Sequence, residues 1–275
     1  MSFSEIRESE LKEVFSALED TFNASGVDFY IIGAIARDVW YARGQKTFRG
    51  TKDVDFAILV GSYAAYDAVR EYLEQHHGFK NSKENAFVVI SPTGIQVDIL
   101  PFGEIAIDDS ITLQSEGLSS IKIDGLDEVH QSGTERVELM TGHSFKIATL
   151  PSIVLLKLIA FDDRPERRAK DPRDIANIIS HYFDLQADFI YENHTDQFAD
   201  DNDPRSLEEI AATVIGKEIR EIAKANQKLH ERLCTILDSH IEQAERSPFI
   251  RNMVAETKRN VEQCVNWLKY LRESI

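Results

Sequence analysis

The sequence predicts an α+β fold in which a mixed β-sheet flanked by helices is followed by a mainly helical C-terminal region. Two observations lead to this expectation. Up to about residue 150, short β-branched runs alternate with helical apolar spacing, whereas from Pro151 onward nearly every apolar pattern is helical. The 275 residues, 43% of them hydrophobic, suffice for the core of one large or two modest domains. We therefore expect a domain over residues 1–150 and a helical domain over residues 151–275.

The first elements are expected to be a helix, a strand, a tight turn and a second helix. Apolar residues recur at helical spacing from Leu11 to Phe22, and the pattern ends near Gly26. A short β-like run at 29–32 is then broken by Gly33. Apolar spacing from Ala34 onward predicts the next helix.

The middle of the chain alternates between strand and helix patterns. Pro and Gly punctuate two β-rich runs around Pro92-Thr93-Gly94, which predicts a hairpin. Residues 103–134 are rich in Asp, Ser and Gly, so loops and short strands are expected there, lying over the functional site of the domain. The expected elements are a strand from Asp53 to Val60, a helix closed by Gly78, hairpin strands at 86–91 and 94–101, and strands at 135–139 and 143–148.

The C-terminal region begins with an apolar helical run that contains Lys157. Asp171 is expected to cap the following helix, with Pro172 at its first position. The polar stretch 192–204 predicts a linker or a mobile loop. Three helices are expected after it, at about 206–223, 225–245 and 253–273.

Three carboxylates on two of the predicted strands suggest a metal site. Asp53 and Asp55 alternate with apolar residues, so they share one face of a strand. Asp98 lies in a second apolar run, and pairing of the two strands would bring all three acids together. Carboxylate oxygens suit Mg²⁺ or Mn²⁺, and such a set can hold two metals roughly 3.5–4 Å apart for phosphoryl displacement.

The turn before these acids fits the same chemistry. Gly33 stands between a strand and a helix N-terminus, and the small Ala34 follows it. The backbone N–H groups of a helix N-terminus bind phosphate, and small residues let the phosphate approach closely. A nucleoside triphosphate is therefore the expected ligand.

This ordered set resembles the DNA polymerase β-type nucleotidyltransferase superfamily. Residues 33–37 (GAIAR) and 49–55 (RGTKDVD) are most similar to the AbiEii/AbiGii-like predicted nucleotidyltransferases, a bacterial group that includes toxins of toxin–antitoxin systems. That group carries a Lys on a helix after the catalytic sheet and then an Asp-x-x-Asp helix start, matched here by Lys157, Asp171 and Asp174. The resemblance covers about residues 25–185. Ala34 departs from the Gly or Ser that is usual in the superfamily.

The resemblance implies a Mg²⁺- or Mn²⁺-dependent enzyme that transfers a nucleoside monophosphate from an NTP to an acceptor, with tRNA or another RNA as a candidate. It implies a nucleotidyltransferase catalytic domain over 1–150, to which 151–185 contributes, and a possible antitoxin partner. The assigned catalytic residues are Asp53, Asp55, Asp98, Lys157 and Asp171, of which the first three are also the metal ligands. The assigned nucleotide-binding residues are Gly33, Ala34, Arg37, Arg49, Thr51, Lys170 and Asp174.

Several of these residues have a structural interpretation as well. Arg37 either binds phosphate or pairs with Asp38, and Lys157 either touches a nucleotide phosphate or extends its amino group to solvent. Asp171 and Asp174 either act in catalysis or cap their helix and pair with nearby arginines. The sequence leaves these alternatives open.

Charge limits the acceptor. With 31 basic and 47 acidic residues the net charge is −16, which argues against broad electrostatic capture of nucleic acid. One local basic cluster could grip a triphosphate or an RNA end, or could consist of solvated loop charges balanced by nearby acids. Its members are Arg164, Arg167, Arg168, Lys170 and Arg173.

The rest of the composition indicates a cytoplasmic globular protein. The longest apolar run, 153–161, is too short to span a bilayer, and the start of the chain lacks the order of a secretion signal. Cys234 and Cys264 have no zinc-ligand spacing and are expected to be reduced and structural.

Three other functions remain as alternatives. A small-molecule nucleotidyltransferase of the aminoglycoside-modifying type shares the catalytic head, and an acidic surface suits a cationic substrate. Residues 33–38 also resemble the motif of tRNA CCA-adding enzymes, although the acidic charge weakens that interpretation. A catalytically silent binding module with the same fold is the third alternative, and failure to bind Mg²⁺-NTP would favour it.

Overall fold

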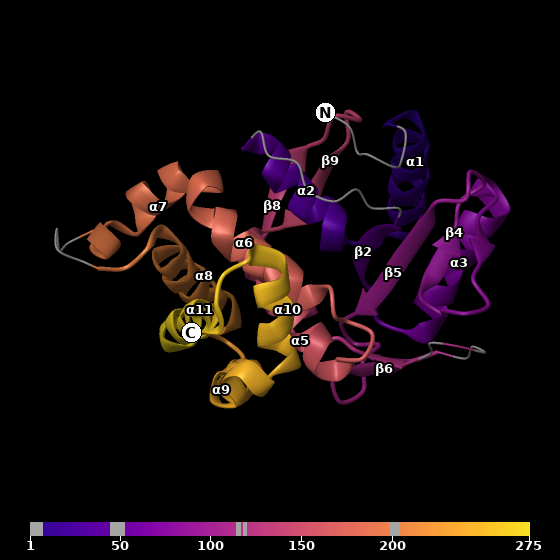
Figure 1. Cartoon of the computed structure of the whole chain (residues 1–275). Coiled ribbons are helices and arrows are strands. Elements are labelled where there is room, and N and C mark those ends of the chain that lie inside the picture. Colours follow the sequence, from indigo (N-terminus) through magenta and orange to yellow (C-terminus); the bar gives the residue numbers. More distant parts are fainter. Residues whose placement is uncertain (1–7, 45–52, 114–116, 118–119, 199–203) are drawn as a thin grey trace. The chain divides into compact units, whose positions relative to one another are not determined.

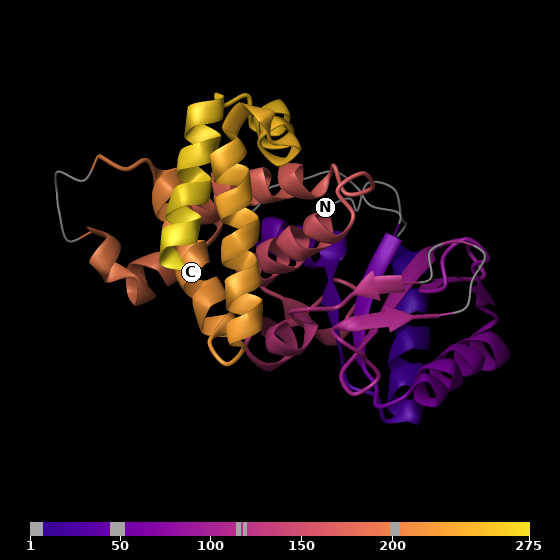
Figure 2. The same ribbon diagram turned by 90° about the horizontal axis from the view of Figure 1, so that it is seen from below.

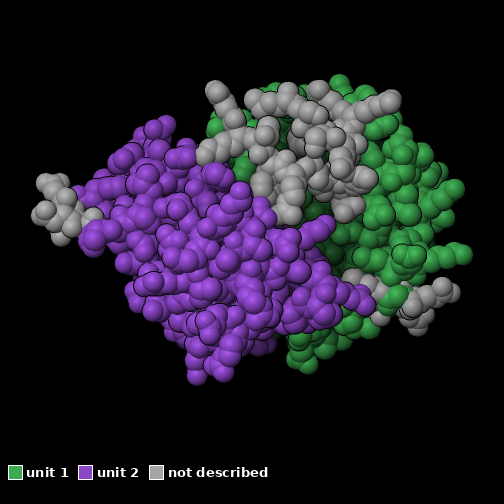
Figure 3. Space-filling view, in the orientation of Figure 1, with its two compact units in different colours: residues 1–149 green, residues 150–275 purple. Residues whose placement is uncertain are grey.

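The computed structural model describes residues 8–44, 53–113, 117, 120–198 and 204–275, without the side chains of Glu8 and Asp53. The chain divides into two compact units, Met1–Thr149 and Leu150–Ile275, which are coloured separately in Figure 3. Within the described residues, no helix is both long and apolar enough to cross a membrane. The α+β class and the helical C-terminal region are confirmed.

The first unit is built on a seven-stranded mixed sheet with the order β3-β4-β5-β2-β1-β9-β8 (Figure 1). β2 is central and pairs antiparallel with β1 and parallel with β5, as a mixed sheet requires. The strands are β1 (Phe29–Ile32), β2 (Asp53–Leu59), β3 (Lys80–Asn81), β4 (Val88–Ile90), β5 (Gln96–Phe102), β8 (Thr134–Glu138) and β9 (Ser144–Ala148), and β6 (Ser110–Thr112) pairs with β7 (Ser120–Lys122) in a separate two-stranded sheet.

Two helices, α1 (Glu8–Ser25) and α3 (Tyr63–His77), lie side by side on one face of this sheet (Figure 2). Phe15 and Phe22 of α1 are buried against Phe56 of β2, with ring centroids 6.1 and 5.8 Å apart. Because side chains alternate across a strand, burial of Phe56 on this face turns its neighbour Asp55 to the opposite face. The aromatic core thus fixes which way the acidic strand faces.

The helix α2 (Gly33–Arg43) follows β1 without an intervening loop. Its Trp40 is buried and donates a hydrogen bond from Nε1 to the carbonyl oxygen of Ala148 in β9, at 2.8 Å. This contact and the direct connection to β1 hold the N-terminus of α2 at the end of the central strands.

One prediction for the first unit is wrong. Residues 103–134 contain a short helix, α4 (Leu126–Ser132), in addition to the predicted short strands. Gly125 precedes α4 with a φ of +85°, and Leu126 and Val129 are buried beneath it. A seven-residue helix offers only those two apolar contacts, and the surrounding polar composition concealed its period.

The second unit consists of helices, and α11 packs against α8 and α9 (Figure 2). A Cβ atom at Gly216 of α8 would lie 2.7 Å from the Cβ of Ser274 in α11, so only glycine permits this close approach. The helices are α5 (Leu150–Asp163), α6 (Asp171–Leu185), α7 (Ala187–Asn193), α8 (Leu207–Ala223), α9 (Gln227–Gln243), α10 (Pro248–Thr257) and α11 (Val261–Ser274), with 3₁₀ turns η1 (Thr195–Phe198) and η2 (Ala244–Arg246).

The prediction of a single helix at 253–273 is wrong, because α10 and α11 share that region. Lys258 ends α10 in the left-handed conformation, with a φ of 58°. Asn260 then starts α11 with a capping box, in which its side chain and that of Gln263 bond each other's backbone N–H groups. Two strong local signals therefore override the continuous apolar spacing.

The polar stretch 192–204 is also more regular than expected. It contains the end of α7 and the turn η1, and the rings of Tyr191 and Phe198 stack with centroids 4.8 Å apart. Residues 199–203 lie outside the described part of the chain.

Asp171 does not cap α6, contrary to the prediction. Lys170 is the N-cap residue, Asp171 is the first helical residue and Pro172 is the second. The Asp171 carboxylate bonds to Lys157 rather than to the backbone of its own helix, which accounts for the shift by one residue.

Candidate active site

Two acidic residues lie side by side at the centre of the first unit. In the parallel pairing of β2 with β5, Asp55 is in register with Asp98, so the two Cα atoms are about 4.8 Å apart, the spacing of neighbouring strands. Registered residues point to the same face, and both of these are half-buried. The fold therefore places two like charges together on a rigid scaffold.

Gly33 packs directly against the first of these carboxylates. Its φ is +66°. The preceding residue, Ile32 of β1, is in register with Asp55 along the edge of β2 opposite to β5. A Cβ atom at Gly33 would lie 2.8 Å from the Cγ of Asp55. Both the backbone conformation and the contact require glycine here.

The N-terminus of α2 begins at this glycine. Ile32 occupies the N-cap position and makes no side-chain cap hydrogen bond. The first-turn residues Gly33 and Ala34 are half-buried. Neither carries a side chain larger than a methyl group. The positive end of the helix dipole and the first-turn N–H groups are therefore held close to the Asp55 carboxylate.

Not every predicted ligand can be placed. Arg49 and Thr51, and the side chain of Asp53, lie outside the described part of the structure. Asp53 belongs by its backbone to β2, two residues from Asp55, and is in register with Gln96. Among the side chains that the structure describes, no three His, Cys, Asp or Glu residues form a group that could hold a metal ion.

Arg37 forms an ion pair with the next residue. Its Nε and Nη2 atoms donate to Oδ1 of Asp38 at 3.0 and 2.8 Å, and its side chain is 4% exposed. Of the two interpretations that the sequence left open, the structure contains the ion pair.

A second cluster of charges lies in the helical unit. Lys157 stands on the apolar helix α5, and its Nζ atom lies 2.7 Å from Oδ1 of Asp171 and 2.8 Å from Oδ2 of Asp174. All three side chains are at least 85% buried. Burial alone would lower the pKa of Lys157, but attraction to the two carboxylates outweighs it and raises the pKa above its ordinary value of 10.5.

The second oxygen of Asp171 has a different environment. Its Oδ2 atom is buried and has no hydrogen-bond partner among the described residues. Nη1 of Arg168 lies 4.0 Å from it, beyond hydrogen-bonding distance. Lys170, another predicted nucleotide ligand, is exposed at the start of α6.

The sequence interpretation did not foresee that one lysine joins both acids. Asp171 and Asp174 are three residues apart on a helix and hence face the same way, which is a usable signal. An isolated lysine among the apolar residues of α5 is the matching signal. Lys157 does not extend its amino group to solvent, which was one of the two interpretations. Its side chain is only 15% exposed.

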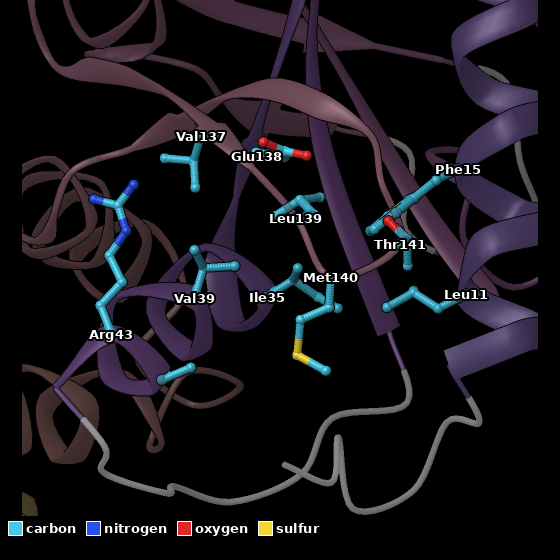
Figure 4. Close-up of a pocket in the computed structure, with 11 residues that line it drawn as sticks. Leu11, Phe15, Ile35, Val39, Arg43, Val137, Glu138, Leu139, Met140 and Thr141 are labelled. Atoms are coloured by element: carbon cyan, nitrogen blue, oxygen red, sulfur yellow. The ribbon is translucent and has the colours of Figure 1, made fainter.

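A pocket of about 230 Å³ lies elsewhere in the first unit, between α1, α2 and the chain that follows β8 (Figure 4). Apolar side chains such as Phe15, Val39 and Met140 line it. None of the described residues around it belongs to the predicted site. A triphosphate needs polar donors, so this pocket is unsuited to the phosphates of a nucleotide.

The model of the family described as nucleotidyl transferase AbiEii toxin, type IV toxin–antitoxin system, matches residues 17–263. The solved structures similar to this chain include the solution structure of the antibiotic-resistance factor ANT(2'')-Ia, with a TM-score of 0.39 and 12% identity, covering 70% of this chain and 97% of that one. No curated protein matched the chain.

Proposed function

The chain belongs to the family of AbiEii nucleotidyltransferase toxins, and from this premise we propose that it transfers a nucleoside monophosphate from an NTP to RNA at the acids of β2 and β5. The protein is thus a nucleotidyltransferase, and its family belongs to type IV toxin–antitoxin systems, which implies an antitoxin. The observation that carries the proposal is the register of Asp55 with Asp98.

The donor set fits a divalent cation. Asp55 and Asp98 offer carboxylate oxygens from adjacent strands, and Asp53 is two residues from Asp55 on the same strand. Hard oxygen ligands on rigid backbone suit Mg²⁺, and enzymes of this kind generally use divalent metals. When bound, Mg²⁺ would lower the pKa of the acceptor hydroxyl and offset charge on the phosphates.

The remaining roles fall to the protein's own groups. The N–H groups at the start of α2 would bind the β- and γ-phosphates, because they stand beside Asp55 and carry the positive end of the helix dipole. Gly33 leaves room for that approach. Asp98, beside Asp55, would accept the proton of the attacking hydroxyl. Pyrophosphate leaves as the new phosphodiester bond forms.

We also propose that Lys157, Asp171 and Asp174 serve this reaction. A lysine with a raised pKa stays protonated and can offset charge that develops on a nucleotide phosphate. The buried Oδ2 of Asp171 keeps the capacity to accept a hydrogen bond from a substrate group. Arg49, Thr51 and Lys170 remain proposed nucleotide ligands, and the cytoplasm is the proposed location because NTPs and tRNA occur there.

The test is label transfer. The purified protein is incubated with each α-³²P-labelled NTP, Mg²⁺ or Mn²⁺, total bacterial RNA and a pool of aminoglycosides. Label on RNA supports the proposal. Label on a small molecule instead would contradict the RNA acceptor, and no label together with no NTP binding by calorimetry would contradict nucleotidyl transfer by this chain.

A further inference from the structure

The loop between α5 and α6 carries a concentration of arginines in a chain whose net charge is −16. Two nearby acids are already paired, one with an arginine outside the loop and one with an arginine of the loop itself. Asp162 accepts a hydrogen bond from Arg232 of α9 at 3.0 Å, and Asp163 pairs with Nε of Arg164 at 3.0 Å. The local excess of positive charge must therefore be judged from the remaining arginines.

Arg164 is the most enclosed of them. Its side chain is 16% exposed, and its buried Nε atom, although near Asp163, makes no well-aligned hydrogen bond within the described residues. Burial lowers the pKa of Arg164, and the charges of Arg168 and Arg167 lower it further. Three guanidinium groups are thus close enough to repel one another, and a bound anion would relieve that repulsion.

The other two arginines reach solvent. Arg167 is 64% exposed and its Nε atom lies 3.9 Å from Oε1 of Glu166, which is itself 67% exposed. Arg168 is 42% exposed and stays 4.0 Å from Asp171, whose other oxygen is held by Lys157. Neither distance is a hydrogen bond, and exposed pairs of this kind contribute little.

We propose that Arg164, Arg167 and Arg168 form a binding site for the phosphodiester backbone of the acceptor nucleic acid. The inference rests on the proposed function, in which that acceptor is RNA. A guanidinium pairs with two phosphate oxygens at once, and three of them within five residues can engage more than one phosphate.

Two features favour a polynucleotide over the triphosphate of the donor. The side chains of Arg167 and Arg168 are exposed rather than enclosed, which suits a long strand that crosses a surface. The strongly acidic protein needs a local cationic site to hold any polyanion, because phosphate neutralisation supplies most of that affinity. Lys170 is exposed nearby in the sequence and extends the positive charge, whereas Nε of Arg173 donates to Oδ1 of Asn252 at 3.1 Å.

The test is tRNA binding by the full chain. Fluorescein-labelled bacterial tRNA is titrated with the wild type, with Arg167→Gln/Arg168→Gln, and with the control Arg220→Gln/Arg259→Gln. The control removes two exposed arginines, one in α8 and one between α10 and α11 that pairs with the surface carboxylate of Glu208. We expect about tenfold weaker binding for the first variant only. The plot of log affinity against log salt should also become shallower by about two, since each lost phosphate contact contributes about 0.9.

Three results would overturn the inference. These are unchanged tRNA affinity in Arg167→Gln/Arg168→Gln, an equal loss in the control, and loss of NTP binding in place of tRNA binding. A wild type that binds tRNA through these arginines but transfers no label would contradict the proposed function and leave the binding site standing. Melting temperatures of both variants are expected to match the wild type, because the altered side chains are on the surface.

Discussion

Two pairs of carboxylates in this protein have opposite environments. Asp55 and Asp98 are brought together by strand register, and the fold thereby places like charges side by side. Asp171 and Asp174 are also neighbours, but Lys157 lies within 2.8 Å of each and neutralises them internally. The first pair is held by the pairing of two strands, whereas the second is held by a lysine that both carboxylates share.

The difference suggests how function and stability are divided. Like charges that a fold holds together are suited to an external cation, which compensates them when it binds. In a buried ion triad the charges neutralise one another, and removal of one member leaves a buried charge uncompensated. Substitutions in the first pair should therefore act on metal binding and activity, whereas those in the triad should also lower stability.

The largest effect is expected at Asp55. Asp55→Asn should lower label transfer on the order of 10³-fold, about 4 kcal/mol in transition-state stabilisation, because the amide is a poor metal ligand. Asp67→Asn on the exposed face of α3 is the matched control and should remain active. Transfer by Asp55→Asn at the wild-type rate would remove the site from its proposed position.

The second effect concerns stability. Lys157→Met should lower the free energy of unfolding by about 3–5 kcal/mol, since it leaves Asp171 and Asp174 buried without a cation. Urea denaturation measures this. The triple variant Lys157→Met/Asp171→Asn/Asp174→Asn should recover part of the loss, and a single variant as stable as the wild type would contradict a buried ion triad.

The pH dependence of the same variant sharpens this point. Lys157 has a raised pKa in the folded protein, so its contribution is fully present below pH 10.5 and is lost as pH rises through the folded-state pKa. The difference in unfolding free energy between wild type and Lys157→Met should thus be constant from pH 8 to 10 and shrink above that range. A difference that grows with rising pH would contradict the assigned direction.

A comparison of Gly26 with Gly33 distinguishes the effect of backbone strain from the effect of contact with Asp55. Gly33 and Gly26 have nearly equal φ values, +66° and +63°, but only Gly33 touches Asp55. Gly26→Ala should lower stability by about 1–2 kcal/mol, from the left-handed conformation. Gly33→Ala should lower it by more, because its Cβ would also clash with Asp55. Gly33→Ala alone should also reduce label transfer, by about 10- to 100-fold, and equal activities in the two variants would show that the contact is unimportant.

The smallest effect is expected at Asp98. Mg²⁺ should raise the free energy of unfolding of the wild type by about 1 kcal/mol more than that of Asp98→Asn, because the amide is the poorer metal ligand. Urea denaturation with and without Mg²⁺ measures it. An equal effect of Mg²⁺ on both proteins would contradict metal binding by Asp98.

The sequence predicts the surroundings of Asp55 and Asp98 better than the contacts of Lys157. The strand that carries Asp55, the turn at Gly33 and the hairpin that carries Asp98 each have a strong local pattern, and the pairing of β2 with β5 followed as an inference. The bonds of Lys157 join residues on two helices, and helical period alone cannot identify which side chains meet. Packing between helices supplies that information.

Local signals also explain the remaining errors. At the break between α10 and α11, the left-handed position that glycine usually occupies is taken by Lys258. Without a glycine to mark the end of α10, the apolar spacing predicted one helix. The helix α4 is too short to show a period. In both places short-range hydrogen bonding decides the outcome, and composition says little about it.

The most direct test of the contrast is a titration of Mn²⁺ in the absence of nucleotide, followed by the electron paramagnetic resonance signal of free Mn²⁺. We compare the wild type, Asp55→Asn/Asp98→Asn, and Asp171→Asn/Asp174→Asn. The account predicts that Mn²⁺ binding is lost in the first variant and retained in the second. Equal binding by the wild type and Asp55→Asn/Asp98→Asn would contradict it.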